Sequence, residues 1–431
     1  MLSFFFQRRQ PAHQTRHSTN DFTSEHFCHV NFKIFLLDCN RTVMPFISSL
    51  CKIDFVSIGI GGLVLLVISP LLVLQIVIAT IWEIVDVKIV KFQKLCAWFN
   101  VNIKVNVLHG LVREHTDHFM MNVLILNGIL FPFYLIFEGM WVIGNDGRIS
   151  FVRLLLYHVL RFGPNVSNFA YVNTLIHKEC HGRIFKPSQM NHVFEYIVGP
   201  FHGILPGNYS LAHVYIHHKY DNSIEDITTV IDFPRDSFIN FLGYSYRYLL
   251  YSLNLSTIVF FYNTQQWKKC RQAILCTVYY LGFLFSWAYF VSPTFAIVYL
   301  FYPVLQSNFI ISAINYTWHA FIQPGDAQNR HINSTTIYNG EYFILEEEYH
   351  AIHHLYAGVH WTKHKTLYER HLKDCKTPTC FYNINVFELW GMIVFRSYDK
   401  LAENAKIDKA LLVQRLQFTS PGRVSLHYSC F

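Results

Sequence analysis

Histidine is the residue type in this sequence that points most directly to chemistry. The chain holds 24 histidines, nearly as many as its 28 aspartates and glutamates together. Side chains three and four positions apart on a helix share one face, about 5 to 6 Å apart, close enough to bind one metal ion. Three segments, which we name boxes one, two and three, have such spacings: His177-Lys-Glu-Cys-His181, His213-Val-Tyr-Ile-His217-His218 and His350-Ala-Ile-His353-His354. One such pair is weak evidence, but three boxes in one chain predict a metal centre.

The number of candidate ligands indicates more than one metal ion. Asn315 and His319 add a further pair at i and i+4 spacing. Nine histidines exceed the four ligands of a tetrahedral zinc site, so we predict two metal ions. Imidazole suits iron, copper, zinc and nickel, so the ligand type alone does not name the metal. Neutral ligands close to long apolar segments favour two irons that activate O₂ against an unactivated C–H bond.

Carboxylates near the boxes could orient the ligand rings. A metal-binding histidine usually donates its second ring N–H to an acceptor. We predict this role for Glu179, Asp221 and Glu347. Three other carboxylates are also close in the sequence, namely Glu225, Asp226 and Glu346. The sequence does not assign individual carboxylates to individual rings.

The overall composition is that of a membrane protein. Of the 431 residues, 52% are apolar and 15% are charged, against roughly 25% charged in an ordinary soluble domain. This excludes a soluble or disordered chain and predicts an all-α integral membrane protein. The net charge of +7 suits a surface near anionic lipid. No basic run is interleaved with stacking aromatics, so we expect no nucleic acid partner.

Uncharged segments divide the chain. Segments long enough to cross a hydrocarbon layer of roughly 30 Å predict four core spans in two transmembrane hairpins. They lie near residues 119–144, 152–176, 273–291 and 294–314, inside a domain at 109–395. An extra N-terminal transmembrane or re-entrant helix is predicted at 55–84, with a poorly ordered tail at 1–54 and a C-terminal tail at 396–431. The aromatic segment 238–262 is expected to lie on the membrane as an interfacial helix.

Charge places the boxes on one side of the membrane. Lys268, Lys269 and Arg271 precede the second hairpin, and such an excess of basic residues is typical of cytosolic flanks. Entrance and exit of that hairpin are then both cytosolic. The ends of both hairpins, box two and box three should therefore meet in one cytosolic helical layer that caps the spans and holds the two irons.

At these residues the chain resembles the membrane fatty acid desaturase family. Its boxes have the forms HxxxH, HxxxHH and HxxHH in the same order, with a long apolar stretch between the second and third. The Asn315 to His319 element is similar to the NxxxH feature of stearoyl-CoA-type desaturases. That similarity implies that His319 binds iron and that Asn315 reaches iron through water. The resemblance covers roughly residues 109–371.

The resemblance implies an O₂-dependent enzyme that introduces a double bond into the acyl chain of an acyl-CoA, an acyl lipid or a sphingoid lipid. It implies no catalytic side chains beyond the metal ligands. The chain has no HPGG haem motif, so electrons should come from a separate donor, cytochrome b5 or ferredoxin. The expected location is the endoplasmic reticulum membrane, with the active site facing the cytosol. His350 stands where front-end desaturases have glutamine, which favours a methyl-end, Δ9-like or sphingolipid-like enzyme.

Two alternatives stay open at the level of sequence. A di-iron fatty acid hydroxylase or alkane-type monooxygenase would use the same ligands but insert oxygen. A non-catalytic metal-binding membrane protein or transporter would place the ligands at mid-membrane. Seven histidines near the boxes are expected to lie outside the centre: His158, His192, His202, His331, His360, His364 and His371.

Overall fold

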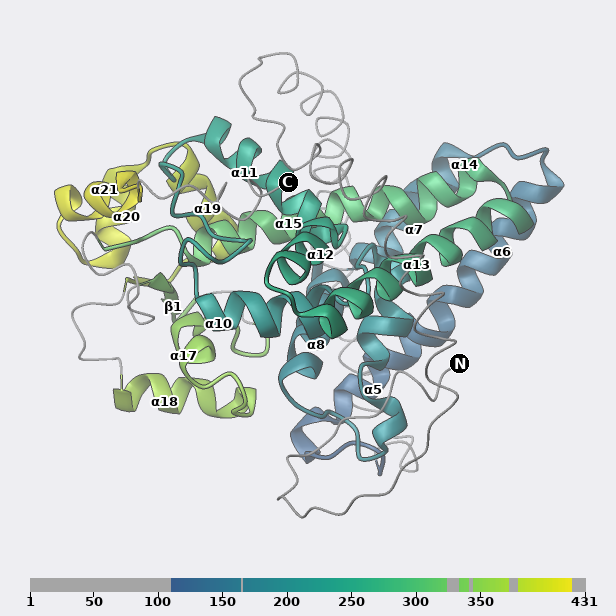
Figure 1. The fold of residues 1–431 in the computed structure, drawn as a ribbon, viewed down its shortest axis with the longest axis horizontal. Coiled ribbons are helices and arrows are strands. Elements are labelled where there is room, and N and C mark those ends of the chain that lie inside the picture. Colours follow the sequence, from purple (N-terminus) through teal and green to yellow (C-terminus); the bar gives the residue numbers. More distant parts are fainter. Residues whose placement is uncertain (1–109, 164–165, 324–332, 341–343, 372–378, 421–431) are drawn as a thin grey trace, which may run out of the picture.

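The computed structural model describes residues 110–420, except 164–165, 324–332, 341–343 and 372–378. The tail predicted at 1–54 and the helix predicted at 55–84 lie outside the described residues. The described part is mostly helical, with long helices grouped at one end and shorter helices at the other (Figure 1). The prediction of a helical protein is confirmed in this broad sense.

Three helical runs are long and apolar enough to cross a membrane. The first run, His115–Gly144, comprises η2 (His115–Asp117), α5 (His118–Ile125), η3 (Leu126–Leu130) and α6 (Phe131–Gly144). The second is α13 (Trp267–Phe290). The third, Pro293–Trp318, comprises α14 (Pro293–Phe295), η8 (Ala296–Phe301) and α15 (Tyr302–Trp318). These runs contain nearly all of the spans predicted near 119–144, 273–291 and 294–314, and each extends up to six residues further at one end.

The span predicted near 152–176 is not a single helix. The chain forms α7 (Phe151–Phe162) and α8 (Ser167–His181) instead. They are separated at Gly163, which has a φ of +69°. A residue with a side chain rarely adopts this conformation, and a Cβ here would lie 2.6 Å from Cβ of Asn168. The second span predicted for the first hairpin is therefore two helices separated at Gly163.

The two arginines of α7 bind groups on neighbouring elements. Arg153 pairs with the buried carboxylate of Glu138 on α6 at 2.8 Å. Arg161 is fully buried and donates to the side chains of Gln306 and Ser307 and to the carbonyl of His202. A guanidinium can be buried in this way because its donors are satisfied by oxygen atoms.

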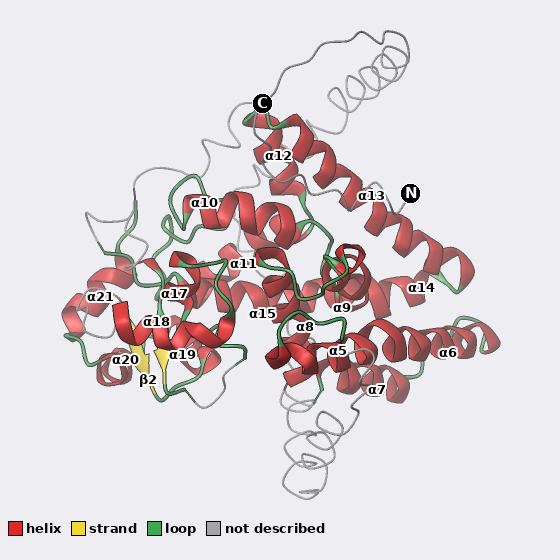
Figure 2. Cartoon of the chain, turned by 90° about the horizontal axis from the view of Figure 1, so that it is seen from below, coloured by secondary structure: helices red, strands yellow, loops and turns green. Residues whose placement is uncertain are grey.

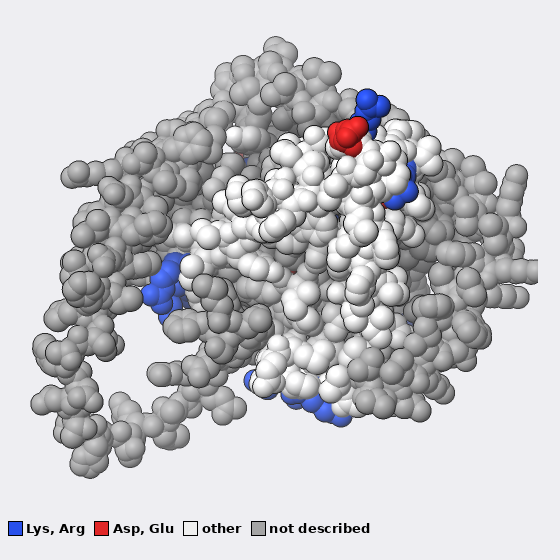
Figure 3. All heavy atoms as spheres, turned by 90° about the vertical axis from the view of Figure 1, so that its right-hand side faces the viewer, with Lys and Arg blue, Asp and Glu red and all other residues white. Residues whose placement is uncertain are grey.

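The long helices present an apolar surface. Large side chains on α6 and α13 are strongly exposed, with Phe137 at 65% and Phe285 at 70%. Figure 3 shows the face formed by this end of the molecule, with charged side chains confined to its edges. Contiguous apolar surface of this extent marks a membrane or protein contact, and here it lies on helices of spanning length.

Residues 238–262 do not form the expected interfacial helix. They form α11 (Phe238–Ser252) and most of α12 (Leu255–Asn263), separated at Asn254 with a φ of 60°. Helix α11 packs against α15, and Phe241 and Tyr244 are fully buried. Arg247 is neutralised by Asp232 at 2.6 Å. This segment is therefore part of the protein core.

The remaining helices lie between α8 and α11 and after α15 in the chain. Between α8 and α11 lie η5 (Ser188–Met190), η6 (Phe194–Val198), α9 (Gly199–His202), η7 (Asn208–His217) and α10 (His218–Tyr220). After α15 come α17 (His350–Leu355), η9 (Trp361–Lys363), α18 (His364–His371), α19 (Val386–Val394), α20 (Tyr398–Ala405) and α21 (Lys409–Gln417). Leu401, Leu412 and Leu416 are fully buried, so much of the predicted C-terminal tail is packed structure.

Two short strands depart from the all-α prediction. β1 (Thr336–Tyr338) pairs in parallel with β2 (Cys380–Tyr382), with Ile337 opposite Phe381. Figure 2 shows this pair among the helices near α18, α19 and α20. The strands fasten the segment before box three to the C-terminal helices.

The crossing of α9 and α15 gives a test of the fold. Gly203 ends α9 with a φ of +77°, and a Cβ here would lie 2.3 Å from the carbonyl carbon of Pro303. We expect Gly203→Ala to lower the unfolding temperature in detergent strongly, because the left-handed conformation alone costs about 1–2 kcal/mol and backbone cannot yield. Gly144→Ala is the control, since nothing lies within 4 Å of a Cβ there. Equal melting of the two variants would contradict this crossing.

Candidate metal centre

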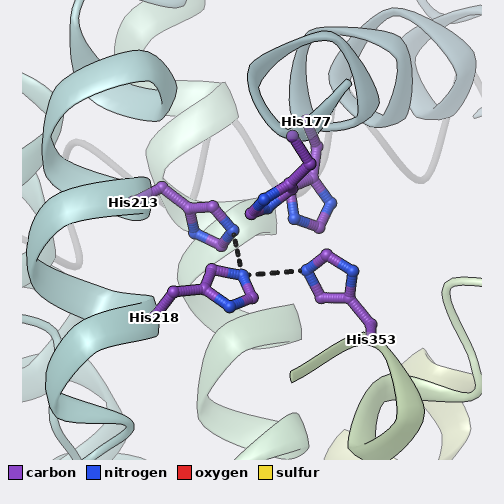
Figure 4. Close-up of side chains that lie close together, drawn as sticks. His177, His213, His218 and His353 are labelled. Carbon is purple, nitrogen blue, oxygen red and sulfur yellow. Dashed lines mark hydrogen bonds between the residues drawn. The ribbon is translucent and has the colours of Figure 1, made fainter. Parts of the chain in front are cut away.

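The nine predicted histidine ligands lie together in two clusters. The first cluster consists of His177, His181, His213, His218 and His353. The second cluster consists of His217, His319, His350 and His354. Within each cluster, one nitrogen of every ring lies within 4.8 Å of one nitrogen of every other ring. Figure 4 shows rings of the first cluster converging from separate elements.

Four separate parts of the fold supply these rings. Box one lies at the end of α8, and box two lies on η7 and the start of α10. His319 follows the last residue of α15, and box three lies on α17. The predicted convergence of the boxes in one layer is therefore observed. Neither cluster can form from one segment alone.

Box two is divided between the clusters by an unusual helix. In an α-helix, His213 and His217 would share a face and His218 would point about 100° away from His217. The structure instead places His213 and His218 in the first cluster and His217 in the second. Their segment, η7, is a π-helix, in which residues five apart are hydrogen-bonded and lie close together.

The ring nitrogens face one another at short range. In the first cluster, Nε2 of His218 lies 3.0 Å from Nε2 of His213 and 2.9 Å from Nε2 of His353 (Figure 4). In the second cluster, Nε2 of His319 lies 3.3 Å from Nε2 of both His217 and His350. Ligands at 2.0–2.1 Å from one metal ion would be separated by about 3.0–3.4 Å. The spacing therefore suits metal ligands.

Oxygen atoms behind the rings determine which ring nitrogens are free to bind metal. In three of the four rings of the second cluster Nδ1 faces an acceptor: His217 faces Asp226 at 2.7 Å, His354 faces Asp221 at 2.8 Å, and His319 faces the carbonyl of Asn333 at 2.8 Å. Each Nδ1 therefore carries the proton, and each Nε2 presents a lone pair. Lone pairs directed at one another repel, and a cation between them removes that repulsion. The residues present therefore fit a metal ion.

The pKa shifts of His218 and Asp226 favour the same protonation states, whereas for His217 burial is outweighed by the carboxylate of Asp226, which raises the pKa of that ring. Burial and the neighbouring His354 and His181 hold the pKa of His218 well below its ordinary value, so its ring is neutral. Burial would raise the pKa of Asp226, but His217 and hydrogen bonds from Thr228 outweigh it and hold that pKa below its usual range. Neutral rings beside ionised carboxylates are the combination that a metal cation requires.

The predicted carboxylates have different roles. Asp221 faces His354, and Oε2 of Glu347 lies 3.1 Å from Nδ1 of His177. Both contacts agree with the prediction that these carboxylates orient ligand rings. Glu347 also pairs with Lys178 at 2.5 Å. The prediction for Glu179 is wrong, because its carboxylate accepts backbone N–H groups at the start of η6 instead of a histidine N–H. Asp226, left unassigned by the sequence, holds His217.

Asn315 lies four residues before His319 of the second cluster. Its side chain is oriented by Tyr244, which the sequence did not indicate as a site residue. Its Nδ2 donates to the hydroxyl of Tyr244 at 2.6 Å, and that hydroxyl donates to the carbonyl of Thr228. The contact fixes the direction of the amide. Tyr244 lies on α11, the segment expected on the membrane surface, so nothing in the sequence brought it to this site.

The other histidines near the boxes belong to neither cluster among the described residues. His158 and His202 are buried in the helical core, and His360 pairs with Asp117 at 3.0 Å. His364 is buried, with its ring 6.1 Å from that of His353. His331 lies outside the described residues.

A cavity of about 450 Å³ adjoins the clusters. Its wall includes His177 and His213 of the first cluster and His350 of the second. Most of the remaining wall is apolar or aromatic, including Phe169, Ala170, Ile311, Ile314, Trp318 and Val386. Burial raises the pKa of Glu348, another wall residue, to about 8, so this carboxyl is largely neutral at neutral pH. The volume lies within the range of about 300–1,000 Å³ typical of ligand pockets.

Comparison with known proteins identifies a family. A family model described as fatty acid desaturase matches residues 150–384, more than half of the chain. The matched segment contains all three boxes and both clusters. No curated protein and no solved structure matches the chain.

The carboxylates behind the rings give a test of the centre. We expect Asp226→Ala to weaken retention of Fe²⁺ by roughly 10- to 100-fold, because His217 loses the acceptor that fixes its ring and tautomer. Iron retained by the purified protein during titration with a chelator is the measurement. Asp399→Ala is the control, since that carboxylate is 88% exposed in a surface pair with Lys409. Equal retention by both variants would show that Asp226 does not act on a bound metal.

Proposed function

The chain belongs to the fatty acid desaturase family, and from this premise we propose that it is an O₂-dependent enzyme that introduces a double bond into the acyl chain of a lipid or an acyl-CoA. One observation carries the proposal. Two clusters of buried histidines, each fit for one metal ion, adjoin the same largely apolar cavity.

The ligand set suits two irons. The nine histidines would hold them, and Asn315 would reach one of them through water. Iron bound there would supply the activation of O₂ that hydrogen removal from an unactivated methylene requires. The chain's own residues orient the rings, exclude bulk water and position the substrate. No further catalytic side chain is needed for these tasks.

The cavity explains how an acyl chain could meet both clusters. His177 and His213 belong to one cluster and His350 to the other, and all three line the same wall. A chain lying along the apolar wall would therefore pass both candidate metal positions. Apolar contacts would hold it in place, because a methylene chain offers no hydrogen-bonding group.

A transport or storage role fits the geometry less well. His319 directly follows the apolar run Pro293–Trp318, so the second cluster lies at the end of that run and not at its middle. Asp226 and Asp221 fix individual rings from behind. Ligands that are fixed in position, beside a cavity large enough for an organic substrate, support catalysis more than they support the passage of an ion.

The membrane setting and partners follow by inference. Three helices of spanning length support an integral membrane protein. Lys268 and Lys269 lie at the start of α13, and the hairpin returns to His319 on that same side. The positive-inside bias therefore favours a cytosolic active site. The membrane that we propose is that of the endoplasmic reticulum. A separate donor, cytochrome b5 or ferredoxin, would deliver the electrons.

Lipid analysis tests the reaction. Expressed in a host that lacks its own desaturase, the chain should yield lipids that have lost two hydrogens. His217→Ala should abolish this product, while His371→Ala, an exposed histidine outside both clusters, should retain it. A product that gains one oxygen atom would instead identify a hydroxylase. Full desaturation by His217→Ala would refute the role of the second cluster.

The cavity gives an independent test. Ala170 lines it from α8, and Ala170→Phe should reduce conversion on the order of tenfold or more, because the acyl chain would be displaced from the clusters. Iron content should stay at the wild-type value, since Ala170 is not a ligand. Ala170→Ser, which adds little volume, is the matched control. Unchanged conversion by Ala170→Phe would place the substrate elsewhere.

A further inference from the structure

The helix that carries box two is unusual in its length. π-Helical turns occur mostly as single-turn bulges inside α-helices, but η7 extends over 10 residues, Asn208–His217. Bonds between residues five apart occur at both ends: the carbonyl of Gly207 accepts the N–H groups of both Leu211 and Ala212, each at 3.2 Å, and the N–H of His218 bonds to the carbonyl of His213. A helix form this rare needs stabilisation from outside itself.

The start of η7 is capped by one buried carboxylate. Oε1 of Glu195 accepts the backbone N–H groups of Gly207, Tyr209 and Ser210, each at 3.0 Å. The intervening N–H, of Asn208, bonds to the carbonyl of Leu205 at 3.3 Å. Glu195 is 1% exposed. Every N–H at this helix start therefore has a partner, and three of them share the same oxygen.

Glu195 is itself held by the helix of box one. It lies on η6 (Phe194–Val198), whose first N–H groups are accepted by Glu179 of α8, at 2.8 Å from Val193 and 3.0 Å from Phe194. Glu179 lies between His177 and His181 in the sequence. Two buried carboxylates thus connect box one, η6 and box two in series.

The helical register decides which cluster each ring joins. At about 100° per residue, an α-helix would turn His218 roughly 140° away from His213. In a π-helix, with about 4.4 residues per turn, the same five steps leave only about 50° between them. The first cluster contains both His213 and His218, so it depends on the π-helical register.

We infer that Glu195 is a positioning residue: its carboxylate selects the π-helical register of η7 and thereby brings His218 to the same metal ion as His213. The inference rests on the proposed function, because it takes both clusters to bind iron. It assigns no chemical step to Glu195. The residue acts through the ligands that its helix carries.

Iron stoichiometry tests this role without measuring turnover. Wild-type protein purified in detergent and loaded with Fe²⁺ should hold about two irons per chain, and Glu195→Ala about one. The Mössbauer spectrum of Glu195→Ala should lack the signal of the lost iron. Glu195→Gln keeps a carbonyl oxygen at the same position and should restore both irons. Asp399→Ala removes an exposed surface carboxylate that pairs with Lys409, and it should match the wild type.

The outcomes separate the inference from the function on which it rests. A Glu195→Ala variant with two irons and the wild-type spectrum would overturn the inference alone. Wild-type protein that binds no iron would overturn the proposed function and the inference together. If Glu195→Ala does not accumulate, Glu195→Asp withdraws the carboxylate by one methylene and should also lose iron; wild-type iron content in that variant overturns the inference.

Discussion

The structure of the centre depends on the repulsion between ring nitrogens that face one another without protons. Buried oxygens of Asp221, Asp226 and Asn333 hold the Nδ1 protons of three rings and direct their Nε2 lone pairs inward. An apolar protein interior does not stabilise such an arrangement by itself. A cation does, and the strength of its bonds to the rings can then compensate for burying several polar groups in one layer.

The site was predictable where the signal is local. Spacing within each box is a property of a few consecutive residues, so all nine histidines were found from the sequence, and the structure brings them together. The role of Glu179 and the contact of Tyr244 with Asn315 depend on which elements meet in space. The separation of His217 from His218 follows from any helix, but the pairing of His213 with His218 does not follow from a regular α-helix, and nothing in those residues alone indicates a π-helix.

The fold was predictable where a long uncharged segment forms one helix, as in α13 and the run to Trp318. It was not predictable where charge is buried. Arg161 and Arg247 are charged residues inside two largely apolar segments, 152–176 and 238–262, yet the first bonds to oxygens of neighbouring helices and the second pairs with Asp232. Partners for such groups come from segments distant in the sequence, so hydropathy along the chain does not reveal them.

The position of α17 has a consequence for biosynthesis. It supplies His353 to one cluster and His350 and His354 to the other, so both clusters depend on the last box to emerge from the ribosome. Box two ends at His218 and the last apolar run ends at Trp318, so both are made before box three. A nascent chain that ends before His350 would therefore present two incomplete ligand sets, and iron would be captured firmly only after box three had been made.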